Sequence, residues 1–500
     1  MGTAFSGIPD DNQLVQSPCS PSWFSSSSSK GPDKESRHVV NWHVPYDPEN
    51  PLDWGTKTRW VQIVLVSILM LQAAMASSMP APGAASILKE YEAPEGALTS
   101  LVVSIFNLGS AFGTMMASPL SELHGRYLVY SISNILFLVC NAACALSPNL
   151  SVLLAFRSLS GCTGAVPFVI GSSTIADMAQ FPWRSRALSV YSLALMLGSV
   201  IGPSVGGFLA QYFGWRWIFW SLCILAAVTN VASLFLLRET SVRTLLEKRA
   251  NKIRKTTGDP EYISALSISG VFPGMAFSEA IKEPFRLLIL HPIMFSFSLY
   301  FAVVYGVLYL FFTTFPMVFT SRYNFSTGFS GLTFLGVGVG IIIGAVLDLF
   351  WGDRIAASLL LKKGIRTPEL RLSLMAYSAP LIPTGILLYG WTVEKTIFWL
   401  VPMTGTIIFG VGIMLLFAPA MPYLMEAFPF HAASAITALI MLSGIFGAFL
   451  PIIGPPVYSA LSLGWGNTII AGITVALVPI PWLIMKQVLG MREKDSEQAW

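Results

Sequence analysis

Glycine and proline are concentrated in one apolar stretch of the chain, at Gly198, Gly202, Pro203, Gly206 and Gly207. Glycines four residues apart on a helix allow a neighbouring helix to approach closely. Proline removes one backbone hydrogen bond and bends the helix that contains it. Ordinary tight packing explains two or three small residues but accounts poorly for the whole arrangement. A bent, closely packed helix between two parts of a membrane protein could act as a rocking seal, which is a device of transporters.

Few side chains in the apolar stretches could perform chemistry, and Arg157 is the most unusual of them. A permanent charge within a membrane span is expensive and usually faces an aqueous cavity or a partner. The alternative is a structural arginine that bonds backbone carbonyls at a kink. Aromatic rings with one polar edge suit varied, partly apolar ligands. An amphipathic pocket could therefore be lined by Asn107, Tyr300, Tyr305 and Tyr309, although each taken singly is more commonly a packing residue.

The elements that hold these residues are membrane-spanning helices. The chain of 500 residues is 54% hydrophobic and 11% charged, whereas a soluble protein has about 25% charged residues. Apolar segments of about 20 residues are long enough to cross the hydrocarbon core of a bilayer. We therefore predict an all-α membrane protein with twelve transmembrane helices, near residues 60–79, 98–117, 128–146, 152–176, 187–210, 216–237, 292–319, 329–350, 372–391, 396–424, 432–459 and 465–485.

A polar stretch near the middle of the chain divides the predicted spans into six and six. A weak internal repeat relates the halves, since Gly202-Pro203 recurs as Gly454-Pro455, and Gly214-Trp215 as Gly464-Trp465. Two six-helix halves related by an axis along the membrane normal are the layout of many secondary transporters. The expected units are a disordered cytoplasmic tail (1–58), an N-terminal bundle (59–237), a cytoplasmic linker (238–290), a C-terminal bundle (291–486) and a second cytoplasmic tail (487–500).

Basic residues determine the expected orientation. With twelve spans, one side of the membrane carries 25 of the 30 Lys and Arg residues, and such an excess marks the cytoplasmic side. Both termini are therefore expected in the cytoplasm, with the plasma membrane as the expected location and the vacuolar membrane as the alternative. The net charge of +4 gives no indication of nucleic-acid binding. Residues 242–255 form a basic amphipathic helix, either on the anionic inner leaflet with its apolar face down or as a solvated link between the halves.

Several motifs resemble those of the major facilitator superfamily. The segment Gly198–Gly207 fits the antiporter pattern G-x-x-x-G-P-x-x-G-G without a mismatch. Ser118–Tyr127 is similar to the loop motif after the second span, and Arg157–Gly161 to the Arg-x-x-x-Gly motif of the fourth. Asp47–Trp54, before the first span, and the tyrosine-rich Tyr300–Pro316 are similar to segments of fungal multidrug exporters. The resemblance covers roughly residues 45–490 and implies the major facilitator fold, in the twelve-span drug:proton antiporter branch.

The resemblance also implies roles for charged residues near the cytoplasmic ends of the spans. Gly125 would allow a tight turn, and Arg126 would pair with Asp177 at the end of the fourth span. Glu122 would meet a helix N-terminus of the opposite half, where the helix dipole favours negative charge. Together these contacts would latch the cytoplasmic side shut, whereas the alternative for any single charge is a solvated loop position. Glu426 takes a position where relatives commonly have Asp.

By the same resemblance, Arg157 takes part in proton coupling or substrate binding. The first predicted span has no acidic residue, although many proton-coupled relatives have one there. Proton coupling therefore rests on the resemblance, because no buried carboxylate relay is visible in the sequence. Glu426, Asp177 or protonation of the substrate are the alternatives to Arg157.

The resulting hypothesis is a secondary transporter that exports amphipathic small molecules by alternating access, in exchange for protons. An exporter of polyamines or organic acids is the alternative within transport, and a transport-dead membrane sensor is the alternative outside it. An enzyme is not expected, because the sequence has no phosphate loop, His-x-x-x-His pair or histidine cluster. We expect a monomer without cofactor or metal, whose partners are the lipid bilayer, a small-molecule substrate and protons. Glycosylation sequons lie at Asn149 and Asn324.

Overall fold

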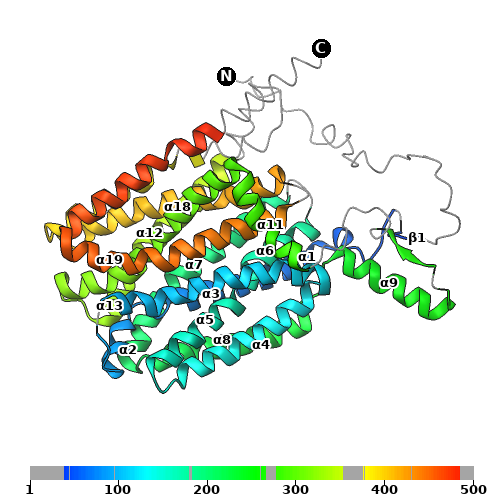
Figure 1. Ribbon diagram of the computed structural model, residues 1–500, viewed down its shortest axis with the longest axis horizontal. Helices are drawn as coiled ribbons and strands as arrows, with labels where there is room; N and C mark the ends of the chain where they lie inside the picture. Colours follow the sequence, from blue (N-terminus) through cyan, green and yellow to red (C-terminus); the bar gives the residue numbers. More distant parts are fainter. Residues whose placement is uncertain are drawn as a thin grey trace, which may run out of the picture.

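Long apolar helices lie side by side and run along the long axis of the molecule (Figure 1). The structure is a computed structural model that describes residues 39–43, 45–94, 96–179, 183–259, 261–265, 277–352, 375–376, 378–428 and 431–484. The outer surface of the bundle is apolar, and Val228 and Phe235, for example, are 62% and 83% exposed. Such a surface suits the hydrocarbon of a bilayer, in which helices satisfy their own backbone polar groups.

The first part of the bundle follows the predicted spans. The predicted span 152–176 consists of two helices, because the chain breaks at Ala165 and Pro167 stands in the first turn of the second helix. Proline is favoured at this position since its missing N–H would have no helical partner there. The helices of this part are α1 (Thr56–Ser78), α2 (Ala84–Glu90), α3 (Ala97–His124), α4 (Arg126–Ala145), α5 (Leu150–Gly164), α6 (Val166–Met178), α7 (Trp183–Tyr212) and α8 (Arg216–Leu236).

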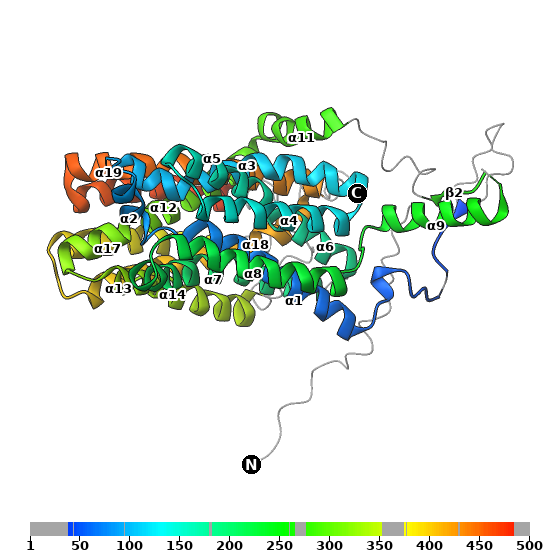
Figure 2. The same ribbon diagram turned by 90° about the horizontal axis from the view of Figure 1, so that it is seen from below.

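The second part of the bundle begins after the linker. An α-helix, α11 (Phe277–Leu290), lies beside the bundle before the first long helix of this part (Figure 2). The linker itself contains α9 (Val242–Thr257) and the strand β2 (Ile263–Ser264). The remaining helices are α12 (Pro292–Tyr323), α13 (Thr327–Leu332), α14 (Leu335–Leu347), the π-helical turn η3 (Asp348–Gly352), α17 (Leu381–Glu394), α18 (Leu400–Ala427) and α19 (Ala432–Leu477).

Ten helices of the described chain are long and apolar enough to cross a membrane, against twelve predicted spans. One of the ten, Ala432–Ile484, contains two predicted spans, which join at Ser462 with a left-handed φ of 68°. After this kink, the N–H groups of Leu463 and Gly464 donate to the Glu394 carboxylate at 3.0 and 3.3 Å. The predicted span 372–391 overlaps α17, which has 14 residues, and its residues 372–374 and 377 lie outside the described part.

Several pairs of helices join the first part of the bundle to the second. The helix α3 packs along α19, and α7 packs along α13 and α14. Gly444 of α19 is close to α3, because a Cβ at this position would lie 2.9 Å from the Asn107 carbonyl oxygen. The two parts therefore meet mainly through α3 and α7 on one side and through α13, α14, α18 and α19 on the other.

The segment before α1 differs from the disorder expected of the tail. Residues Val39–Val40 form the strand β1, which pairs in parallel with β2, and Pro51–Asp53 form a 3-10 turn, η2. Asp47 is buried and its carboxylate pairs with the Arg249 guanidinium of α9 at 2.6 Å. Burial opposes ionisation of Asp47, but hydrogen bonds from the His43 N–H, Arg249 and the Glu49 N–H outweigh it and lower its pKa to about 2. An ionised carboxylate therefore fixes residues of the tail to the linker.

The linker helix α9 does not lie across the end of the bundle. It projects beyond that end in both views (Figures 1 and 2). Its apolar residues Leu246 and Ala250 are buried, and the helix contacts β1 and β2. Because this face is partly covered by the chain itself, α9 fits the alternative of a link between the halves better than that of a helix lying apolar face down on the inner leaflet. The helix links the halves and holds the tail.

Candidate functional site

Three glycines of α7 face α1, a helix of the same part of the bundle. They stand four residues apart, and the residues that they meet, two in α1 and one directly after it, are also four apart. A Cβ at each of them would lie within 3.0 Å of a carbonyl oxygen, and the pairs are Gly198 with Leu71, Gly202 with Met75, and Gly206 with Met79. Since a methyl group does not fit at such distances, the glycines bring the two helix backbones together, as their spacing predicted.

The fourth glycine of this cluster, Gly207, faces the opposite part of the bundle. A Cβ here would lie 2.8 Å from the carbonyl oxygen of Thr327 in α13. One turn away, the Ser204 hydroxyl donates to the Gly331 carbonyl at 3.1 Å, and a Cβ on Gly331 would lie 2.5 Å from the Pro203 carbonyl oxygen. We call this contact between Pro203–Gln211 of α7 and Thr327–Gly331 of α13 the α7–α13 seam. It joins the two parts of the bundle at the end opposite α9 (Figure 1).

Arg157 lies fully buried in α5, in the first part of the bundle. Its guanidinium stacks over the rings of Phe106 and Phe219, with 5.2 and 5.8 Å from Cζ to the ring centroids. None of the described carboxylates forms an ion pair with it. Its four hydrogen bonds go to backbone carbonyls of α1 and α3, those of Ala76 (2.8 Å), Ser77 (3.4 Å), Val102 (3.3 Å) and Val103 (3.3 Å). This is the geometry of the structural alternative, in which the arginine clamps two helices to a third.

A chain of neutral hydroxyl groups starts beside Arg157 and crosses to the second part of the bundle. The Ser77 Oγ lies 2.6 Å from the Tyr309 hydroxyl, and the Tyr305 hydroxyl donates to that of Tyr309 at 3.3 Å. Ser77 also donates to the Ala74 carbonyl at 2.7 Å. We call Ser77, Tyr309 and Tyr305 the hydroxyl chain. The sequence predicted the two tyrosines as cavity residues but gave no reason to single out Ser77.

Asn107 and Tyr300 are also buried, as the pocket hypothesis required, but they do not belong to the hydroxyl chain. The Asn107 side-chain amide donates to the Gly447 carbonyl of α19 at 3.2 Å, so it holds the two parts of the bundle together. A Cβ on Gly447 would lie 3.0 Å from the Tyr305 ring, which places Asn107 near the hydroxyl chain. The hydroxyl of Tyr300 has no hydrogen-bond partner among the described residues.

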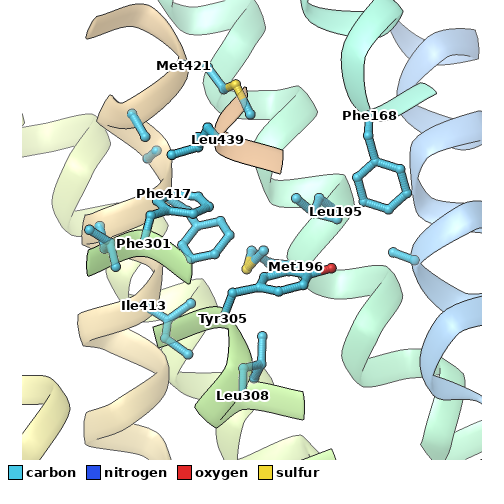
Figure 3. Packing of buried hydrophobic residues seen from close by; sticks show 14 of the residues in the cluster. Phe168, Leu195, Met196, Phe301, Tyr305, Leu308, Ile413, Phe417, Met421 and Leu439 are labelled. Atoms are coloured by element: carbon cyan, nitrogen blue, oxygen red, sulfur yellow. The ribbon is translucent and has the colours of Figure 1, made fainter. Parts of the chain in front are cut away.

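Aromatic and sulfur-containing side chains surround Tyr305 at the centre of the bundle (Figure 3). The rings of Phe301 and Phe417 lie 3.9 Å apart between centroids, and Tyr305 stacks on Phe417 at 6.1 Å. Leu195 and Phe168, from α7 and α6, lie on the other side of this view. The residues belong to one buried apolar cluster that contains helices of both parts of the bundle. A molecule bound here would contact rings and aliphatic groups and few polar atoms.

At the end of the bundle near α9, charged residues form a second cluster. Arg126 Nε lies 3.4 Å from Asp177 Oδ2, which is the pairing that the resemblance implied. The Glu239 carboxylate accepts the N–H groups of Arg126 at 2.9 Å and Tyr127 at 3.2 Å, the first residues of α4. Gly125 has a φ of 89°, and a Cβ there would lie 2.3 Å from Glu239 Oε2. The glycine therefore permits both the turn and the approach of the carboxylate.

Glu239 is the residue of this cluster that the sequence reasoning missed. Its carboxylate stabilises the N-terminus of α4, where unpaired N–H groups and the helix dipole favour negative charge. It also accepts the N–H of Ser241 at 2.9 Å, so it fixes the start of the linker as well. The available signal was an acidic residue two positions after the sixth predicted span, but the sequence does not tell which helix such a residue caps.

The other predicted site residues are dispersed. Glu122 is half-buried at the end of α3, and its charged neighbours are Arg126, Glu283 of α11 and Arg243. Within the described residues it makes no hydrogen bond to a helix N-terminus of the opposite part. Glu426 is exposed at the end of α18. The sequon residues Asn149 and Asn324 are also exposed, the first as the N-cap of α5 and the second after the end of α12.

Sequence comparison assigns the family. The sequence profile of the Major Facilitator Superfamily matches residues 66–455. The chain belongs to this superfamily. It is therefore a multi-span membrane transporter that acts on small-molecule substrates, built from two helical halves.

Curated fungal proteins resemble the transporter over most of its length. The efflux pump radE of Floropilus chiversii is 42% identical over 457 residues, which is 91% of this chain and 85% of that protein. The MFS-type transporter hepF of Aspergillus oryzae is 39% identical over 89% of this chain and 92% of its own. The MFS-type transporter penM of Penicillium rubens is also 39% identical, over 92% of this chain and 90% of its own.

Solved structures show the same fold at low identity. A partially occluded, inward-open form of the xylose transporter XylE from E. coli superposes with a TM-score of 0.64 over 85% of this chain and 98% of its own, at 15% identity. The human organic anion transporter MFSD10 (TETRAN) gives a TM-score of 0.60 over 86% of this chain and 100% of its own, at 18% identity. These similarities confirm the predicted major facilitator fold.

Proposed function

We propose that this transporter exports amphipathic small molecules by alternating access, in exchange for protons. The observation that carries the proposal is the hydroxyl chain, which lies within the aromatic cluster between the two halves. A site of apolar rings with a few polar groups suits hydrophobic ligands with one polar edge. The efflux function in the name of radE, a protein 42% identical, supports the outward direction.

The two ends of the bundle supply the gates of the proposed cycle. Release at the end opposite α9 requires the α7–α13 seam to open, which breaks the hydrogen bonds between Ser204 and Gly331 and between the Gln211 side chain and the Gly328 N–H. Access at the other end requires movement near Arg126 and Asp177. Rocking of one half against the other about a central site opens these contacts in turn.

Proton coupling is proposed at the charged end of the bundle rather than at Arg157. Arginine does not release its proton under physiological conditions, and all four hydrogen bonds of Arg157 go to helix carbonyls. Asp177 and Glu426 are the carboxylates that remain as candidates, together with protonation of the substrate. Each proton that moves inward supplies about 2.3 kcal/mol per 100 mV of membrane potential, enough for roughly a fifty-fold substrate gradient.

The deciding experiment measures efflux of a fluorescent hydrophobic dye in pump-depleted yeast that expresses the full chain. The cells should export the dye against its concentration gradient, and a protonophore should abolish this transport. Export that persists after the proton gradient collapses would refute exchange for protons. Equal dye content in expressing and non-expressing cells would refute export and favour the transport-dead sensor, whereas selective loss of polyamines or organic acids would favour the alternative transporter.

We propose the plasma membrane as the location of the transporter, with both termini in the cytoplasm, since the basic residues gather at one end. Tags fused to the two termini should be protected from protease added to intact cells. Cleavage of the N-terminal tag would overturn this orientation. The alternative location is the vacuolar membrane, and immunofluorescence would distinguish the two.

Glycosylation at Asn149 or Asn324 would increase the apparent mass of the protein, and treatment with a glycosidase would remove this increase.

A further inference from the structure

The interior of the bundle contains one formal charge in its described helices, that of Arg157. The acidic residues of the spanning helices stand near helix ends, as Glu122, Asp177, Glu394 and Glu426 do. Carbonyl dipoles and aromatic faces stabilise the charge of Arg157 without cancelling it, and no described carboxylate neutralises it. A net positive potential therefore remains inside the bundle.

This potential acts on the place where a substrate would bind. The Arg157 Nη2 donates to the carbonyl of Ser77, and the hydroxyl of the same serine begins the hydroxyl chain that ends at Tyr305. The chain is made of hydroxyl groups alone, and in a low-dielectric interior such groups do not screen a charge as water does. A cation beside Tyr305 would be repelled by Arg157 and would meet no described carboxylate there.

The remaining surroundings of Tyr305 favour a flat, uncharged molecule. Phe301, Tyr305 and Phe417 present aromatic faces, and Leu195 supplies an aliphatic surface from the other half. The Tyr305 hydroxyl can turn from Tyr309 to donate a hydrogen bond to an oxygen atom of a ligand. From these features we infer that the transporter selects uncharged, oxygen-bearing ring compounds and rejects organic cations of the same size. This inference rests on the proposed export function.

Two dyes with the same benzophenoxazine ring system test the selection by charge. Nile red is an uncharged ketone, whereas Nile blue carries a positive charge at neutral pH. We expect expressing cells to export Nile red at an initial rate on the order of ten-fold higher than Nile blue, relative to cells without the transporter. Repulsion between unit charges roughly 10 Å apart gives a ratio of this size at an effective dielectric constant of about 20.

The outcomes separate the inference from the function on which it rests. Export of Nile blue at a rate within about two-fold of Nile red would overturn the selection by charge and leave the export function intact. Export of neither dye by protein that reaches the cell surface would contradict the export function itself, and the inference with it. Export of Nile blue alone would reverse the inferred preference.

A gain-of-function variant provides a second test. Leu195→Asp places a carboxylate in the central cluster, so it should admit Nile blue, whereas the uncharged Leu195→Asn should not. Nile blue export by both variants would mean that polarity or loosened packing, and not charge, admits the cation. Tyr305→Phe removes one hydrogen bond and should lower Nile red export about five-fold. If Leu195→Asp fails to reach the membrane, the comparison of the two dyes in the unmodified transporter still decides.

Discussion

Replacing Gly207 with alanine is expected to impair transport while leaving the folded protein abundant. Gly207 lies on α7 where this helix faces α13 of the other half. A Cβ at this position would lie 2.8 Å from the Thr327 carbonyl oxygen and 3.3 Å from that of Gly328. Both neighbours are backbone atoms that cannot rotate away, so the two helices must separate by several tenths of an ångström.

The cost of this separation sets the size of the effect. Inserting a methyl group into a closely packed site costs about 1–3 kcal/mol, and one added methyl against two carbonyls belongs near the lower end, at about 1–2 kcal/mol. The strain exists only while α7 and α13 touch. It therefore raises the free energy of the state closed at this end relative to the open state, and shifts their ratio by about 5- to 30-fold.

Accessibility of a cysteine in the seam measures this shift directly. Ser204 is 8% exposed and bonds to Gly331 across the seam, so Ser204→Cys should react with a membrane-impermeant maleimide only when the seam opens. Adding Gly207→Ala should speed this labelling by about 5- to 30-fold, as derived above for the population shift. The initial rate of dye export, normalised to surface abundance, should fall in the same variant.

Two further glycines serve as controls for the Gly207 prediction. Gly472→Ala adds a methyl group where no atom lies within 4 Å of the new Cβ, so labelling and export should both stay unchanged. Gly206 faces Met79 of its own half, with 2.1 Å from the new Cβ to the carbonyl oxygen, so Gly206→Ala should chiefly lower abundance. Normal export and unchanged labelling in an abundant Gly207→Ala variant would refute a seam that closes during transport.

Three other predictions follow from contacts of charged residues. Arg126→Ala and Asp177→Asn should each slow turnover more than they lower abundance. The double variant should be no slower than the slower single variant, since both substitutions break the same contact. Additive losses of rate would show that the two residues act independently. Arg157→Lys should lower the yield of folded protein in detergent, because lysine cannot bond four carbonyls with a planar fork; a normal yield would exclude the clamp. Arg249→Ala should expose residues 39–55 to chymotrypsin in permeabilised cells, because this protease cleaves after aromatic residues such as Trp42 and Tyr46. In the unmodified protein the protection of residues 39–55 should be constant from pH 5 to 8. The pKa of Asp47 is lowered from 3.8 to about 2, so the ion pair loses its stabilising effect only as the pH falls from 3.8 toward 2. Protection that weakens between pH 8 and 5 would contradict this role of Asp47.

The fold could be predicted from the sequence because membrane helices are encoded locally. An apolar run of sufficient length is a span wherever it occurs, and the glycine spacing on α7 specifies close packing without reference to any partner. The spacing does not specify which helix is the partner. The structure shows that Gly198, Gly202 and Gly206 face α1 of the same half and that Gly207 faces the other half. The seal stays a prediction, and among these four glycines Gly207 is the one that supplies a contact with the other half.

Contacts between distant polar residues were the part that the sequence could not supply. Glu239 stands 113 positions from the N–H of Arg126 that it caps, and Ser77 stands 232 positions from Tyr309. Each of these residues is ordinary in its local sequence. The same holds for Asp47, which the sequence placed in a disordered tail because the polar composition of residues 1–58 gives no sign that Arg249 would bury and neutralise its charge.

Arg157 illustrates how the structure changes the meaning of a residue that the sequence singled out. An unpaired charge in a span suggests a coupling site, but a guanidinium with five donors can also satisfy several carbonyls at once. Here it bonds carbonyls near the end of α1 and within α3 while lying in α5, so it fixes three helices of one half. A residue that fixes one half as a rigid unit has the same contacts in every state of a rocking cycle. In the cycle that we propose, its charge acts as a constant field at the hydroxyl chain, whereas the contacts expected to change lie at the α7–α13 seam and at the charged end of the bundle.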